Sequence, residues 1–223
     1  MTGHSSVHRV GQCRTTVVVM GYAFESRSLT PQTWADVEVL FDLPGGSIVR
    51  GCWCMFYRRS GKVSVSAVSG ADNKRQLCEL VQVGVVPGLI GQVDGAPARW
   101  IILGPRKDHA KLQRSAIMKP VDDRDVWSVV CTYVAKRYRG QGVQHRLLKA
   151  AIRHAREQQV QTLEAYPVDK PGRSHEDFMF FGSRSLYERA GLCEVVRRSS
   201  TLSGQAPPPS VGLNQEAGTA GGS

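Results

Sequence analysis

Long apolar runs are absent from this sequence, and no stretch approaches the ~20 residues that a membrane-spanning helix needs. The apolar cluster at residues 17–20 is also too short for the core of a secretion signal. The six cysteines are too scattered for a disulfide scaffold; they are Cys13, Cys52, Cys54, Cys78, Cys131 and Cys193. These absences predict a protein of the reducing cytoplasm that makes no use of a membrane.

Acidic residues are also fewer than basic ones. The chain contains 19 Asp and Glu and 29 Lys and Arg, which gives a formal net charge of +10. Such a bias favours polyanionic ligands: nucleic acid, an acidic surface or a phosphorylated cofactor. Between residues 134 and 160 the only acid is Glu157, among seven Lys and Arg. Charge gathered around one turn and one helix fits a discrete anion, and no recognised nucleic-acid motif occurs.

Hydrophobic periodicity is missing at both ends of the chain. Residues 1–21 are predicted to form a flexible leader, and residues 200–223, rich in Gly, Ser, Ala and Pro, a disordered tail. The intervening residues 22–199 are numerous enough to build one domain with a hydrophobic core.

Strand and helix patterns alternate through that domain. Apolar runs at 88–93 and 98–103 are joined by Asp94-Gly95, the strongest hairpin signal in the chain. Residues 126–134 are typical of a buried strand, and 142–158 of an amphipathic helix. The remaining expected elements are strands at 22–28, 162–166 and 193–198, and helices at 30–43, 73–83 and 185–190. This order indicates a mixed sheet with helices packed on it.

The turn between the buried strand and the amphipathic helix contains Arg139-Gly140-Gln141-Gly142. Glycines allow several backbone N–H groups to point into one concavity, and the helix N-terminus adds further N–H groups and the positive end of its dipole. A diphosphate fits such a turn. The spacing is neither GxGxxG, because His145 stands at the third position, nor that of a P-loop. From the turn alone, a solvated basic loop is the simpler alternative.

The order of motifs around this turn resembles that of the GNAT-superfamily N-acetyltransferases. That family binds the pyrophosphate of acetyl-coenzyme A with an [RQ]-x-x-G-x-[GA] loop after its fourth strand, and residues 139–144 match except for Gln144 at the final, small position. The resemblance is strong over residues 126–198 and looser over 22–110. It implies an α/β (α+β) fold: a mixed, mostly antiparallel twisted sheet of about six to seven strands with helices on both faces. The stretch GCWCM (51–55) resembles one in a bacterial group of this superfamily.

The resemblance also implies a cofactor site for acetyl-coenzyme A as co-substrate. The pantetheine arm is expected along the main chain of the buried strand, and the pyrophosphate in the turn. The expected cofactor residues are Thr132, Tyr133, Val134, Arg139, Gly140, Gln141, Gly142, Val143 and Gln144. No metal is expected, because Cys52 and Cys54 lack a second pair of ligands at zinc-site spacing.

Two residues are candidates for catalysis. Tyr187 stands where many family members have a tyrosine that protonates the coenzyme A sulfur, and Glu164 is the first candidate for the base. Tyr187 as a packed helix residue, Glu164 as a solvent-facing residue, and a water relay in place of a base are the alternatives. A buried Cys131 is expected to pack rather than to carry an acyl group. The residues expected to bind the acceptor are Trp53, Met55 and Phe180.

We therefore expect an acyl-CoA-dependent N-acetyltransferase that moves an acetyl group from acetyl-coenzyme A to a primary amine by direct attack in a ternary complex. The alternative is a catalytically silent acyl-coenzyme A-binding sensor or protein-interaction domain. The expected partners are acetyl-coenzyme A and an amine acceptor, without nucleic acid or membrane, and a homodimer is left open.

Overall fold

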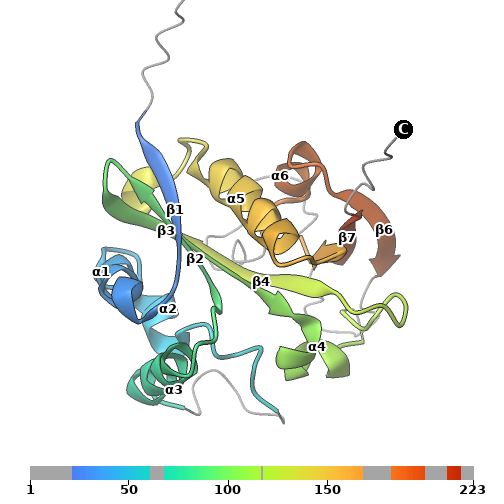
Figure 1. Ribbon diagram of the computed structural model, residues 1–223, viewed down its shortest axis with the longest axis horizontal. Coiled ribbons are helices and arrows are strands. Elements are labelled where there is room, and N and C mark those ends of the chain that lie inside the picture. Colours follow the sequence, from blue (N-terminus) through green and yellow to red (C-terminus); the bar gives the residue numbers. More distant parts are fainter. Residues whose placement is uncertain (1–21, 61–67, 117, 168–181, 199–209, 217–223) are drawn as a thin grey trace, which may run out of the picture.

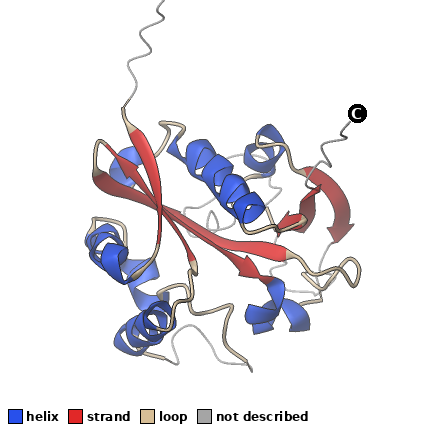
Figure 2. Ribbon diagram, in the orientation of Figure 1, coloured by secondary structure: helices blue, strands red, loops and turns tan. Residues whose placement is uncertain are grey.

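The computed structural model describes residues 22–60, 68–116, 118–167, 182–198 and 210–216. Their centre is a seven-stranded sheet with the strand order β1-β2-β3-β4-β5-β7-β6, and helices cover both of its faces (Figures 1 and 2). The strands are β1 (Phe24–Ser28), β2 (Gly88–Val93), β3 (Ala96–Pro105), β4 (Trp127–Val134), β5 (Thr162–Ala165), β6 (Cys193–Arg198) and β7 (Ser210–Glu216). The helices are α1 (Trp34–Asp42), α2 (Ser47–Cys52), α3 (Gly70–Gln82), α4 (Ala110–Arg114), α5 (Val143–Glu157) and α6 (Arg184–Arg189). The predicted fold class is confirmed.

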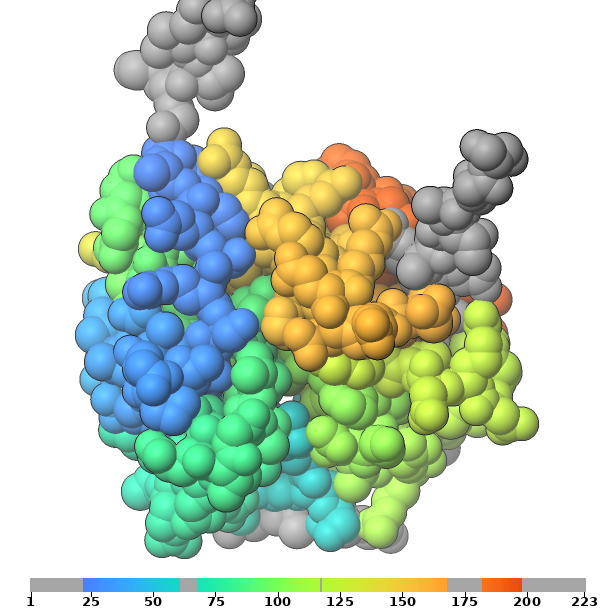
Figure 3. All heavy atoms as spheres, viewed as in Figure 1, coloured from blue at the N-terminus to red at the C-terminus, as the bar shows by residue number. Residues whose placement is uncertain are grey.

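The local signals of the sequence are found where they were expected. Asp94 and Gly95 both take positive φ, 49° and 77°, and turn β2 back onto β3 as an antiparallel hairpin. The predicted amphipathic helix is α5, and its apolar stripe, from Val143 through Leu147 to Ala155, is buried. Helix α5 lies against β1, β2 and β3 (Figures 1 and 3).

The core is divided by the sheet into two layers. Trp100 and Ile102 of β3 pack into a cluster with α1, α2 and α3, whereas Ile101 and Leu103 pack on the other face with α5 and α6. Because both faces are covered, every residue of β2 is buried. None of the described helices has the length and apolar character needed to cross a membrane.

Strand β4 carries a bulge near its middle. Ile102 pairs with Cys131 and Leu103 with Val129, which leaves Val130 as an extra residue in β4. Val130 and Cys131 consequently both pack into the α1 side of the core, as consecutive residues do at a bulge.

Beyond the bulge β4 parts from β5. The two strands run parallel but pair only from Trp127 opposite Leu163 to Val129 opposite Ala165. Strand β5 ends at Ala165, and Pro167, which has no N–H group, follows shortly after. Within the described part of the chain, the main chain of β4 from residue 130 to 134 therefore has no strand partner on the β5 side.

Strand β7 corrects the expectation that residues 200–223 are disordered. Residues 210–216 lie between β5 and β6 and pair antiparallel with both. The prediction was wrong for these residues because it was based on composition. A strand between two others is held by main-chain hydrogen bonds, which most side chains permit. The predicted leader, residues 1–21, lies outside the described residues.

A chain that ends at residue 209 tests the contribution of β7. We expect its free energy of unfolding to fall by at least about 2 kcal/mol, because β5 and β6 both lose the main-chain hydrogen bonds of their shared neighbour. Urea denaturation measures the change, and a chain that ends at residue 216 is the matched control. Equal stability of the two chains would show that β7 contributes nothing.

Candidate functional site

A cavity of about 500 Å³ lies where β4 has parted from β5. Its walls come from the end of β4, the turn that follows, the first turn of α5, and the segment around α6. Eight of the nine cofactor residues expected from the sequence line it: Thr132, Tyr133, Val134, Arg139, Gly140, Gly142, Val143 and Gln144. Gln141 is not among the lining residues; its side chain donates to the Arg137 carbonyl (2.8 Å).

The two glycines of the turn are required by its backbone conformation. Gly140 has φ 75° and Gly142 has φ 72°, the left-handed region that other residues adopt at a cost. A Cβ built on either glycine would meet no atom within 4 Å, so the space beside the turn is open. Gly142 is the N-cap of α5 and offers no side-chain cap. The first N–H groups of α5 have no acceptor within the helix, and such groups can bind an anion.

Gln144, where the sequence departs from the family pattern, directs its side chain across the cavity. Its Nε2 lies 3.5 Å from Oγ1 of Thr132 on β4. A Cβ on Gly182, just before α6, would lie 3.2 Å from the same nitrogen. Gln144 thus occupies space between α5, β4 and the start of α6.

The cavity is positively charged. Three arginines line it, Arg99, Arg139 and Arg189, and no carboxylate does so among the described residues. Arg99 lies on β3 and is 1% exposed, and neither of its terminal guanidinium nitrogens has a hydrogen-bond partner among the described residues. Burial lowers the pKa of Arg99 to about 9. Sequence reasoning missed Arg99; the available signal was a single charge within the apolar run 98–103.

Tyr187 lies behind the wall of the cavity rather than in its lining. Its side chain is fully buried in α6, and its hydroxyl has no described hydrogen-bond partner. Burial raises the pKa of Tyr187, and the nearby charge of Arg99 offsets only part of that rise. The hydroxyl therefore keeps its proton at neutral pH.

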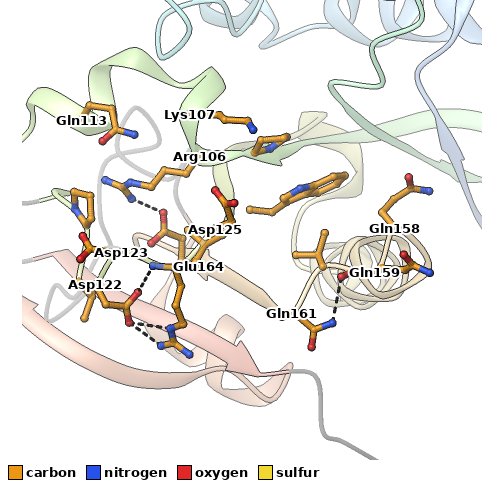
Figure 4. Close-up of a pocket in the computed structure, with 17 residues that line it drawn as sticks. Arg106, Lys107, Gln113, Asp122, Asp123, Asp125, Gln158, Gln159, Gln161 and Glu164 are labelled. Carbon is orange, nitrogen blue, oxygen red and sulfur yellow. Dashed lines mark hydrogen bonds and ion pairs between the residues drawn. The ribbon is translucent and has the colours of Figure 1, made fainter.

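The structure does not bring Glu164 to this cavity. Glu164 is 4% exposed and borders a different hollow of about 510 Å³, where Arg106 points at its carboxylate (Figure 4). Its Oε1 accepts hydrogen bonds from Arg106, from the hydroxyl of Ser128 (2.5 Å) and from that of Tyr166. From the sequence, Glu164 was expected to be either a base at the reaction centre or a solvent-facing residue. In the structure it is instead part of a buried ion pair.

The acceptor residues expected from the sequence are not brought to the cavity either. Trp53 and Met55 are each 6% exposed and belong to the core on the α1 face of the sheet. Trp53 and Cys54 take left-handed φ values of 43° and 57°, which turn the indole inward against Trp34 and Phe41 (centroids 5.9 and 5.0 Å away). The apolar character of GCWCM thus reflects packing. Phe180 lies outside the described residues.

The buried cysteines lie on that same α1 face. The Sγ atoms of Cys131 and Cys54 are 3.6 Å apart, and the contact with Cys131, together with burial, raises the pKa of Cys54. Among the described residues no group of three or more His, Cys, Asp or Glu is arranged to hold a metal ion.

A comparison with protein families decides the assignment. Residues 69–179 match the model of the acetyltransferase (GNAT) family. The chain belongs to the GNAT acetyltransferase family. Comparison with curated proteins gave no significant match.

Solved structures share the fold of this GNAT-family chain at low sequence identity. YncA from Salmonella typhimurium, determined with its cofactor acetyl-CoA, has a TM-score of 0.52 at 13% identity, over 89% of this chain and 97% of YncA. The aminoglycoside acetyltransferase AAC(6')-Ib, in complex with coenzyme A, has a TM-score of 0.51 at 16% identity, over 87% and 95% of the two chains. Ribosomal-protein-alanine N-acetyltransferase from Brucella melitensis has a TM-score of 0.51 at 18% identity, over 86% and 99%.

Substitution of Glu164 by Gln tests whether its ion pair is structural. We expect the free energy of unfolding to fall by about 3 to 5 kcal/mol, because the charge of Arg106 stays buried without its counter-ion. Urea denaturation measures this loss. Asp122→Asn, which breaks the exposed pair with Arg124, is the control and should leave stability nearly unchanged. A Glu164→Gln protein of wild-type stability would contradict the structural role.

Proposed function

We propose that this GNAT-family protein transfers the acetyl group of acetyl-coenzyme A to a primary amine by direct attack in a ternary complex. The observation that carries the proposal is the cavity beside β4. It joins a glycine turn, the N-terminus of α5 and a strand edge that has no partner strand among the described residues, and it is lined by three arginines and no described acid.

The residues present fit coenzyme A in two respects. Open space beside Gly140 and Gly142 and the first N–H groups of α5 suit a diphosphate. The main chain of β4 beyond the bulge suits the two amides of a pantetheine arm, which would add to the sheet like a short strand. Two structures of similar fold were determined with acetyl-CoA or coenzyme A, which supports the same class of ligand here.

The chemistry that bound acetyl-coenzyme A supplies is a thioester carbonyl open to attack by an amine. The chain would orient it through the turn and β4, and an N–H group of β4 past the bulge is placed to polarise the carbonyl. Tyr187 is protonated at neutral pH, and a protonated hydroxyl can donate its proton to a leaving thiolate. Glu164 is paired with Arg106, so we assign removal of the amine proton to water.

A specific observation favours a second candidate, a coenzyme A-binding sensor without catalysis. Neither Tyr187 nor Glu164 lines the cavity that contains the cofactor residues. Release of coenzyme A, measured with acetyl-coenzyme A and a panel of amines, separates the two functions. The panel should contain both aminoglycosides and peptides with N-terminal alanine, the acceptor types in the names of the structural neighbours. Binding without turnover across the panel would support the sensor.

Paired substitutions of Gly142 test the diphosphate turn. Asp and Asn have the same shape and both tolerate positive φ, so Gly142→Asp and Gly142→Asn should disturb the backbone equally. Only Asp places a negative charge at the N-terminus of α5. We expect Gly142→Asp to bind coenzyme A at least about tenfold more weakly than Gly142→Asn, as measured by calorimetry. Equal affinities of the two variants would argue against a diphosphate at this turn.

Tyr187→Phe tests the proposed acid. The substitution removes one buried hydroxyl with no described partner, so the fold should tolerate it. We expect kcat to fall about 100-fold, the usual order for loss of a general acid, with the affinity for coenzyme A unchanged. Steady-state kinetics and calorimetry measure the two effects. An unchanged kcat would assign Tyr187 to packing alone.

A further inference from the structure

Arg99 is a buried charge whose counter-ion is not found among the described residues. It is 1% exposed in the middle of the apolar strand β3, and both terminal nitrogens lack a hydrogen-bond partner there. An isolated buried charge is costly, and proteins normally pair it. Arg106, the other buried arginine, shows the usual solution: a carboxylate, a hydroxyl and two main-chain carbonyls accept its hydrogen bonds.

Among the residues that the structure describes, none near Arg99 offers an anion to replace that partner. Tyr187 is an electrostatic neighbour of Arg99, but burial raises the pKa of Tyr187. The tyrosine therefore keeps its proton and offers Arg99 no negative charge. Glu164 is already paired with Arg106. The described residues that share the cavity with Arg99 include two further arginines and no acid.

The position of Arg99 connects it to the ligand site. It pairs across the sheet with Val134, the last residue of β4, and a single turn of 3-10 helix (Lys136–Tyr138) separates Val134 from the glycine turn. Arg99 also lines the same cavity as Gly140 and Gly142. A cation at this position faces whatever anion the turn and the N-terminus of α5 receive.

We propose that Arg99 is a ligand-binding residue whose partner is an oxyanion, a phosphate or a carboxylate, of the molecule bound in the cavity. The inference rests on the proposed coenzyme A site, although not on acetyl transfer. Two sources of the oxyanion are compatible with it: the diphosphate of the donor, favoured by the closeness to the turn, and a terminal carboxylate on the acyl group.

A ligand-binding role and a structural role for Arg99 predict opposite effects on stability. Arg99→Met keeps most of the side-chain volume and removes a charge that has no partner among the described residues. If the partner is a ligand, the free protein should melt at the same or a higher temperature, while its affinity for the ligand falls. If the partner is a side chain of the chain itself, the free protein should be destabilised. Arg99→Lys, which keeps the charge, should recover part of the affinity.

Calorimetric titration of the full-length protein with three probes tests the proposal. Coenzyme A contains the diphosphate, pantetheine contains neither anion, and S-succinylpantetheine contains only a carboxylate. We expect Arg99→Met to weaken binding of coenzyme A by about 10- to 100-fold, the range for a hydrogen bond to a charged group. Pantetheine should bind both proteins equally. Arg75→Met on α3, where Arg75 is exposed, is the control for net charge.

The outcomes separate this inference from the proposed function. A loss confined to coenzyme A identifies a phosphate of the donor as the partner, and a loss seen also with S-succinylpantetheine identifies the acyl carboxylate. Unchanged affinity for all probes, or a lower melting temperature of free Arg99→Met, overturns the role of Arg99 and leaves the coenzyme A site standing. Wild-type protein that fails to bind coenzyme A overturns the site, and this inference with it. Binding that depends on Arg99 but without turnover refutes only acetyl transfer.

Discussion

The parting of β4 from β5 is the constraint on which the site depends. A bulge at Val130 and the end of β5 at Ala165 leave main-chain groups of β4 without a strand partner in the part of the chain that the structure describes, although buried N–H and C=O groups need a hydrogen-bond partner. The sheet continues on the far side of β5 through β7 and β6, so the opening lies inside the sheet and not at its edge. A ligand with peptide-like groups can complete the interrupted ladder, which makes the cavity a consequence of the topology.

Two buried arginines illustrate how the surroundings decide the role of a charge. Both terminal nitrogens of Arg106 are engaged, by Glu164, Tyr166 and main-chain carbonyls, and so hold together the loop before β4 and strand β5. Arg99 is as deeply buried but lacks such partners among the described residues. Tertiary surroundings thus separate a charge that stabilises the fold from one that the fold leaves for a ligand.

Features that depend on neighbouring residues in the chain could be predicted. The Asp94-Gly95 hairpin, the stripe of α5 and the glycine turn each follow from backbone preference or periodicity over a short span. Eight of nine expected cofactor residues meet at one cavity because they belong to one strand–turn–helix unit. Predictions that required knowledge of a distant partner did worse: Glu164 pairs with Arg106, Trp53 packs on Phe41, and residues 210–216 form a strand only between β5 and β6.

The sequence by itself therefore determined the family, because the order of its motifs resembles that of GNAT acetyltransferases, and the turn that suits a diphosphate, because the turn depends on local spacing. Only the tertiary structure decided which side chains surround that turn. It placed Arg99 of β3 beside the end of β4, directed the side chain of Gln144 to Thr132, and paired Glu164 with Arg106. The physical reason is that pairing and burial are properties of contacts between segments far apart in the chain, which local spacing does not encode.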